Sequence, residues 1–189
     1  MTLDQLNATD VHDAQREFER CCGSTEWAAR MTAARPFATS DAMLVTADAI
    51  WIALDESDWR EAFAAHPRIG ERASGAGGAG RASGAGRAGV AGAAGRAGAS
   101  SAWSAQEQAG VSSADDEVLD RLGAKNREYV DRFGYIFIVC ATGKSADEML
   151  TRLEQRLTND PAVEIRVAAE EQRQITQLRL RKLLTETDV

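Results

Sequence analysis

Apolar residues recur along most of the chain at intervals of three and four, the spacing that places side chains on one face of a helix. One such face comprises Met43, Leu44, Ala47, Ile50, Trp51 and Leu54. A second follows Pro161, a residue suited to the first turn of a helix, and comprises Ile165, Ala168, Ile175, Leu178 and Leu183. The pattern predicts an all-α protein whose helices bury these faces in a common core.

Residues that start and stop helices divide the N-terminal half into short segments. Residues 10–22 are predicted to form a helix that ends at Gly23, and Ser24 is placed to start the next one. Ser57 is a suitable N-cap for a further short helix. That helix should end just before Pro67, because a proline disfavours helical geometry in the residue that precedes it.

The C-terminal half shows the same kind of punctuation. Ser112 and Ser113, followed by acidic residues, predict the start of a helix that runs toward Gly134. Ser145 and Glu148 have the spacing of a capping box, in which the two side chains each bond the other residue's backbone N–H. Two well-marked helices are therefore expected in the C-terminal tail.

The run from Tyr135 to Cys140 departs from this pattern. It is apolar and rich in β-branched residues, which propensity alone would assign to a strand. A single strand in an otherwise helical chain has no neighbour with which to form a ladder. Its backbone donors and acceptors must therefore be satisfied by helix formation, by caps or by a ligand. The run is therefore unusual in this chain.

The chain of 189 residues is long enough for one domain with a sizeable core, and we predict a single compact multi-helix domain over residues 1–189. Residues 73–102 interrupt it with a low-complexity stretch of almost only Gly, Ala, Ser and Arg. Such a stretch cannot bury enough apolar surface to offset the entropy lost on ordering. It is predicted to be a disordered loop inserted into the domain.

Charge and cysteine content narrow the functional classes. The net charge of −7 argues against nucleic acid or a membrane surface as partner, because phosphates would be repelled. Cys21, Cys22 and Cys140 cannot form a disulfide framework, and together with the absence of a signal-peptide pattern at the start they indicate a cytoplasmic protein. His12 and His66 lack the spacing of metal ligands, so no metal is expected.

Two short segments and one arginine could carry chemistry. His66, at a helix end before Pro67, has the side chain best suited to proton transfer near neutral pH, although such a step is more often a simple turn. Ser104 and Glu107 share a helical face, which could equally be only a capping box. Arg179 could pair with a substrate carboxylate, but an arginine on a long charged helix usually faces solvent.

Several stretches, taken in order, resemble the OHCU decarboxylases, which act on 2-oxo-4-hydroxy-4-carboxy-5-ureidoimidazoline. They are Cys22-Gly23-Ser24, Arg35-Pro36-Phe37, His66-Pro67-Arg68-Ile69-Gly70-Glu71, Trp103-Ser104 with Glu107-Gln108-Ala109-Gly110, Phe133-Gly134 with Phe137-Ile138-Val139-Cys140-Ala141, and Leu178-Arg179-Leu180. The resemblance covers nearly the whole chain outside the Gly/Ala-rich loop. The loop itself is a departure, because family members join the His-Pro and Ser-x-x-Glu-Gln motifs by a much shorter link.

The resemblance implies an all-helical, usually homodimeric enzyme that produces (S)-allantoin from a small-molecule substrate without metal or organic cofactor. It places the general acid on His66 and its partner carboxylate on Glu107. It also implies substrate contacts at Pro67, Ser104, Gln108, Phe137, Ile138, Val139, Cys140, Ala141 and Arg179. In the resemblance, the run from Phe137 to Ala141 is an extended apolar segment whose main chain lines the site.

Two other functions fit parts of the sequence. A non-enzymatic helical module could bind a protein through an apolar groove, which explains the helices and the charge but neither the His-Pro step nor the extended apolar run. An enzyme acting on a related ureido acid would share every motif.

Overall fold

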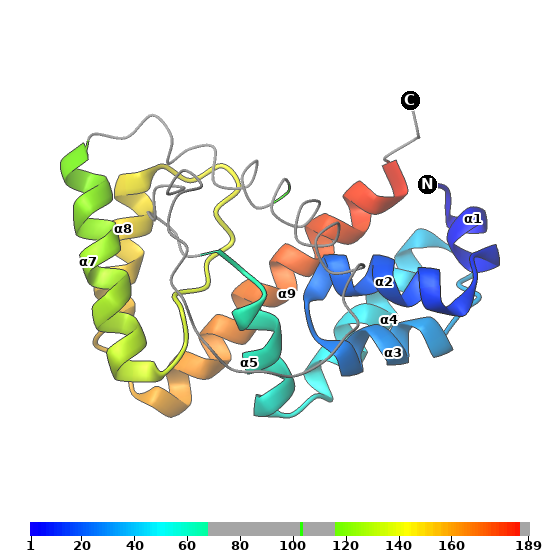
Figure 1. Ribbon diagram of the computed structural model, residues 1–189, viewed down its shortest axis with the longest axis horizontal. Helices are drawn as coiled ribbons and strands as arrows, with labels where there is room; N and C mark the ends of the chain where they lie inside the picture. Colours follow the sequence, from blue (N-terminus) through cyan, green and yellow to red (C-terminus); the bar gives the residue numbers. More distant parts are fainter. Residues whose placement is uncertain (68–102, 104–115, 186–189) are drawn as a thin grey trace, which may run out of the picture.

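The computed structural model describes residues 1–67, 103 and 116–185, and within these residues all regular secondary structure is helical (Figure 1). The helices are α1 (Leu3–Ala8), α2 (Val11–Cys22), α3 (Thr25–Ala33), α4 (Ser40–Ile52), α5 (Glu56–Ala64), α7 (Asp116–Phe133), α8 (Ala146–Arg156) and α9 (Pro161–Thr185). None of the described helices is both long and apolar enough to cross a bilayer. The predicted all-α class is confirmed.

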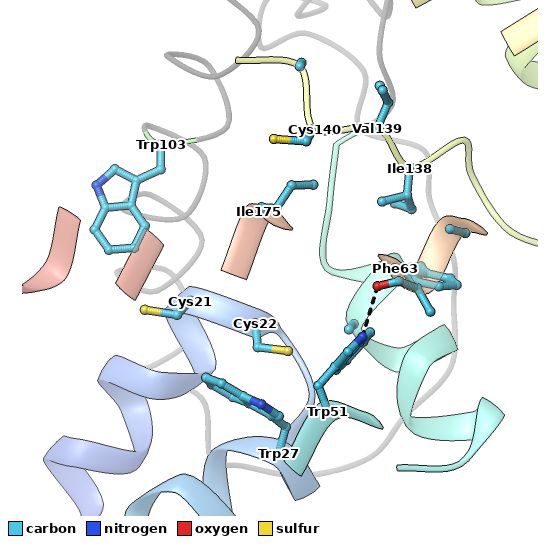
Figure 2. Close-up of a cluster of buried hydrophobic side chains, with 14 of the residues drawn as sticks. Cys21, Cys22, Trp27, Trp51, Phe63, Trp103, Ile138, Val139, Cys140 and Ile175 are labelled. Atoms are coloured by element: carbon cyan, nitrogen blue, oxygen red, sulfur yellow. Dashed lines mark hydrogen bonds between the residues drawn. The ribbon is translucent and has the colours of Figure 1, made fainter. Parts of the chain in front are cut away.

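The C-terminal helix α9 runs diagonally through the molecule (Figure 1). It packs against α2, α4 and α5, while α7 and α8 pair with each other near its N-terminal end. Near its other end, the N-terminal ammonium of Met1 donates to the carbonyl oxygen of Leu183 at 2.9 Å. In its middle, Trp51 Nε1 of α4 donates to the carbonyl oxygen of Ala169 at 3.0 Å (Figure 2). Helix α9 is thus the element on which α2, α4 and α5 all pack.

Most predicted helix ends in the N-terminal half are confirmed. Gly23 ends α2 in the left-handed conformation with φ of 87°, and the Ser24 hydroxyl caps α3 by accepting from Trp27 N at 3.2 Å. The prediction for Ser57 was wrong, because the N-cap of α5 is Asp55. Its carboxylate accepts from two backbone N–H groups of the first turn, where negative charge also complements the helix dipole.

In the C-terminal half, both hydrogen bonds of the predicted Ser145–Glu148 capping box are present, at 3.2 and 2.7 Å. Helix α7 leads to Gly134, which has φ of 77°. The predicted helix start at Ser112 and Ser113 and the low-complexity stretch at 73–102 lie outside the described residues.

Residues 135–141, called here the extended segment, follow α7 and form neither helix nor ladder. Side chains of neighbouring elements bind its backbone instead. Asn126 Oδ1 of α7 accepts from Phe137 N at 3.3 Å, and Glu171 Oε2 of α9 accepts from Cys140 N at 2.7 Å. Arg156 Nη1 of α8 donates to the carbonyl oxygen of Ile138 at 2.7 Å. Three helices thus fix a strand-like sequence that has no partner strand.

The arginine that holds the extended segment belongs to a buried ionic network. Arg156 is 8% exposed and Glu164 is fully buried, and Arg156 Nε donates to Glu164 Oε1 at 2.7 Å. The Tyr129 hydroxyl donates to the same oxygen, and Asn159 Nδ2 donates to Glu164 Oε2 at 2.7 Å. The guanidinium carbon also lies 4.6 Å from the centre of the Phe137 ring. The buried carboxylate is therefore fully hydrogen-bonded.

Removing this arginine should destabilise the fold strongly. In Arg156→Met the Glu164 carboxylate stays buried without its counter-charge, a change that typically costs about 3–5 kcal/mol. Urea denaturation followed by circular dichroism measures the loss. The matched control is Arg121→Met, which breaks the exposed pair with Glu154 and should cost less than about 1 kcal/mol. Equal losses in the two variants would contradict the assigned role of the buried network.

Candidate functional site

His66 lies two residues beyond the last residue of α5, at a turn of the chain. Its backbone N–H donates to the carbonyl oxygen of Phe63 at 3.2 Å, and the exposed Pro67 follows. The residue as a whole is only partly buried, but its Nε2 atom is buried and has no hydrogen-bond partner among the described residues. The predicted helix stop therefore places an imidazole at the edge of the core.

The C-terminal end of α2 packs directly against this turn. A Cβ atom added at Gly23 would lie 2.6 Å from the Cβ of Ala65, the residue before His66. Only a glycine allows this approach, since its positive φ and the missing Cβ are both required. The close contact brings the carbonyl group of Cys22 next to the His66 turn, where Gln172 Nε2 of α9 donates to it at 3.1 Å.

The face of α9 that looks toward this turn carries buried polar side chains, among them Gln172 and Arg179. Gln172 is fully buried and Arg179 is 2% exposed. The expectation that an arginine here would face solvent is therefore wrong. Both residues lie at helical spacing within the stripe of Ala168, Ile175 and Leu183, so the polar interruptions of an apolar stripe were the signal in the sequence. Gln172 was not among the predicted site residues.

The surroundings of His66 favour its neutral form. Burial is the main cause, and the nearby positive charge of Arg179 adds to it, so that the His66 pKa is lowered from 6.5 to about 3. The side chain of Gln172 acts in the opposite direction and raises the pKa. Two residues that the sequence singled out separately, His66 and Arg179, are therefore within electrostatic reach of each other in the folded chain.

The two adjacent cysteines at the end of α2, Cys21 and Cys22, border the same region, but their thiols are unreactive. Both are fully buried, and burial raises the pKa of Cys22 to about 12 and that of Cys21 well above its ordinary value. Arg179 opposes the increase at both thiols. Because thiolates are the reactive form, neither cysteine is suited to act as a nucleophile.

The extended segment approaches the same part of α9. The side chains of its last five residues are all buried, with exposures from 1 to 7%; they are Phe137, Ile138, Val139, Cys140 and Ala141. Figure 2 shows Ile175 of α9 between Cys22 and Cys140 in that view. The bond from Cys140 N to Glu171 also ties the segment to the residue before Gln172.

Of the second predicted motif, Trp103-Ser104 with Glu107-Gln108, the structure describes only Trp103. Trp103 is 6% exposed, and the Arg20 guanidinium of α2 lies 4.5 Å from the centre of its ring. This contact places Trp103 beside the last turn of α2, one residue before Ser104. Ser104, Glu107 and Gln108 themselves lie outside the described residues.

Possible metal ligands do not gather in the described ranges, where no group of three or more His, Cys, Asp or Glu side chains could hold an ion. The arginine and imidazole together, beside main-chain groups of a buried segment, suit an organic anion with polar edges.

Comparison with known proteins places the chain in a family. A family model described as OHCU decarboxylase matches residues 7–181. The chain belongs to the OHCU decarboxylase family. Among curated relatives, the uric acid degradation bifunctional protein TTL of Arabidopsis thaliana is 35% identical over 171 residues, which are 90% of this chain and 47% of that protein. The 2-oxo-4-hydroxy-4-carboxy-5-ureidoimidazoline decarboxylase of Amia calva is 40% identical over 79 residues, 42% of this chain and 45% of that protein.

The matches therefore span about half the length of these two curated relatives. Among solved structures, a crystal structure of OHCU decarboxylase in the presence of (S)-allantoin matches with a TM-score of 0.70 and 34% identity. It covers 90% of this chain and 99% of that one. A crystal structure of (S)-allantoin synthase, 18% identical with a TM-score of 0.64, shares the fold over 97% of this chain and 54% of that one.

The depressed pKa of His66 predicts how stability depends on pH. The unfolded chain binds a proton with a pKa near 6.5, whereas the folded chain does so only near 3, so the free energy of unfolding must fall as pH drops below 6.5. The slope from this residue is at most about 1.4 kcal/mol per pH unit. His66→Asn should therefore lose less stability than wild type between about pH 7 and pH 5 in urea denaturation.

The control for this measurement is His12→Asn, which removes the only other histidine of the chain, an exposed one on α2. Its stability should follow the wild-type dependence on pH. Parallel curves for wild type and His66→Asn would show that His66 is not held neutral in the folded state.

Proposed function

We propose that this protein decarboxylates 2-oxo-4-hydroxy-4-carboxy-5-ureidoimidazoline to (S)-allantoin in the breakdown of uric acid, with His66 as general acid. The observation that carries the proposal is that His66 and buried Arg179, far apart in the sequence and each within a motif shared with the family, lie within electrostatic reach of each other. The names of the matched relatives support the substrate, and the close match to a structure obtained with (S)-allantoin supports the product.

The remaining contacts follow from the proposed site. Arg179 pairs with the carboxylate of the substrate, and main-chain groups of the extended segment hold the polar edge of the ring. In the described part of the chain neither the N–H nor the C=O of Val139 makes a hydrogen bond, so these two groups are available for such contacts. Pro67, Ser104 and Gln108 complete the binding surface, and Glu107 orients the ring through its N–H and hydroxyl groups.

The chemistry needs an electron sink and a proton. The electrons of the breaking C–CO₂ bond move toward the adjacent ring C=N bond, whose nitrogen takes up a proton as CO₂ leaves. The hydroxyl group then loses its proton as the ring carbonyl forms, and the neighbouring ring carbon gains one. The substrate supplies its own electron sink. Delivery of the last proton to one face of the ring sets the S configuration.

A neutral His66 is suited to the second half of this sequence. The imidazole accepts the hydroxyl proton and then donates a proton to the ring carbon, so it is neutral before and after each turnover. The imidazolium that forms in between is the general acid. A histidine already charged in the resting state could not accept the hydroxyl proton.

We also propose that the protein acts as a cytoplasmic homodimer and that residues 1–189 form one domain. The assembly is supported by resemblance to a usually homodimeric family, and the location by the acidic charge and the reduced cysteines. Decarboxylation of a related ureido acid would use the same groups, whereas a purely protein-binding module would leave the His66-Pro67 step and the extended segment unexplained.

Replacement of the general acid should slow turnover without unfolding the protein. His66→Asn keeps a polar side chain of similar size but cannot transfer protons, and kcat should fall about 10² to 10⁴-fold. The measurement follows freshly prepared substrate and the appearance of chiral allantoin by circular dichroism. His12→Asn serves as control and should behave as wild type. An active His66→Asn that still yields the S product at the wild-type rate would remove His66 from the mechanism.

Replacement of the buried arginine should weaken substrate binding. Loss of a hydrogen bond to a charged group is typically worth about 1.5–3 kcal/mol, so KM of Arg179→Met should rise roughly 10- to 100-fold. Arg173→Met is the matched control, since Arg173 lies on α9 but pairs with Asp48 and Glu170. An unchanged KM in a folded Arg179→Met would place the substrate carboxylate elsewhere.

A further inference from the structure

We propose that Gln172 is a positioning residue for His66: its Oε1 accepts a hydrogen bond from the Nε2–H of the imidazole and leaves Nδ1 to exchange protons with the substrate. The assignment of the ring nitrogens concerns the folded protein alone. Its consequence for turnover rests on the function proposed above.

The orientation of the Gln172 amide is fixed by its neighbours. Its Nε2 donates to the carbonyl oxygen of Cys22 at 3.1 Å and to Thr176 Oγ1 at 3.3 Å. The Thr176 hydroxyl donates its own proton to the carbonyl oxygen of Gln172 at 3.0 Å. It can therefore only accept from the Gln172 amide. Both amide protons are thus occupied. The Oε1 atom, which can only accept, is left for a different neighbour.

Two buried atoms near each other lack partners and are complementary. Within the described ranges, Gln172 Oε1 and His66 Nε2 are both buried without a hydrogen bond, although unpaired buried polar atoms are unfavourable. The contact between α2 and α5 brings them together, because Gln172 binds Cys22 while the adjacent Gly23 packs on Ala65, next to His66. The Gln172 side chain also raises the pKa of His66, which agrees with this placement. Pairing them satisfies both atoms.

An acceptor at Nε2 has two consequences for the imidazole. It selects the tautomer with the proton on Nε2, so that the lone pair of the neutral ring is on Nδ1. It also stabilises the imidazolium, in which Nε2 still carries its proton. An amide provides this without adding a charge, so His66 remains neutral at rest. A carboxylate at the same place would keep the ring protonated.

The histidine content makes this directly measurable. His12 and His66 are the only histidines of the chain, so ¹⁵N NMR of the ring nitrogens gives two sets of signals, and His12→Asn identifies those of His66. The expected result at neutral pH is a neutral His66 with its proton on Nε2. In Gln172→Met the preference for this tautomer should be lost. A wild-type His66 protonated on Nδ1, or an unchanged tautomer in Gln172→Met, overturns the proposal.

Gln172→Glu tests the same contact with a side chain of nearly the same size that carries a negative charge. Its carboxylate should raise the pKa of His66 and leave the ring charged at neutral pH. A folded Gln172→Glu with a neutral His66 overturns the proposal, and this variant decides the question if Gln172→Met does not fold. Gln177→Met is the control, because Gln177 is a buried glutamine of α9 that binds Leu44 and Asp48 instead.

Kinetics then separate positioning from packing. Gln172→Met should lower kcat about tenfold or more with KM nearly unchanged, whereas Gln177→Met should leave kcat near the wild-type value. Equal kinetic effects of the two substitutions overturn the positioning role. If wild type does not turn over the substrate, the proposed function fails, while the NMR result still decides the pairing of Gln172 with His66.

Discussion

An extended chain segment buried among helices can persist only if other groups replace the hydrogen bonds that a sheet would supply. Here the replacement is a set of side chains from α7, α8 and α9, and its centre is the buried pair of Arg156 and Glu164. Charges are costly to bury, and this pair is tolerated because Tyr129, Asn159 and the carbonyl group of Ile138 complete its hydrogen bonds. The path of the segment depends on that network.

The same helix that fixes the segment also forms the surroundings of the histidine. Glu171 of α9 binds the backbone of Cys140, and the next residue, Gln172, binds the end of α2 beside the His66 turn. One and two turns further along, Thr176 and Arg179 lie on the same buried side. Main-chain and side-chain parts of the candidate site are therefore set by one rigid element, which limits their relative motion.

Local rules predicted much of this fold from the sequence, but not its polar interior. Periodicity and caps identified the helices, since Gly23 and Ser145 act through their immediate neighbours. Ser57 was misplaced because Asp55, two residues earlier, is an equally good cap, and local sequence does not distinguish them. The burial of Arg179 and Gln172 depends on which helices meet, which spacing alone does not reveal. His66 and Glu107 gained their significance only from the resemblance, and Glu107 lies beyond the described residues.

The balance of charges around His66 links binding to chemistry. In the protein by itself, burial and Arg179 both hold the imidazole neutral, and Gln172 opposes them. An anionic substrate carboxylate paired with Arg179 would offset the positive charge that lowers the pKa of His66. With substrate bound, the imidazole is therefore a stronger base than in the protein alone. As the carboxylate leaves as neutral CO₂, the effect of Arg179 returns and the imidazolium becomes a stronger acid. The same arginine therefore binds the carboxylate before decarboxylation and favours proton delivery by the imidazolium after it.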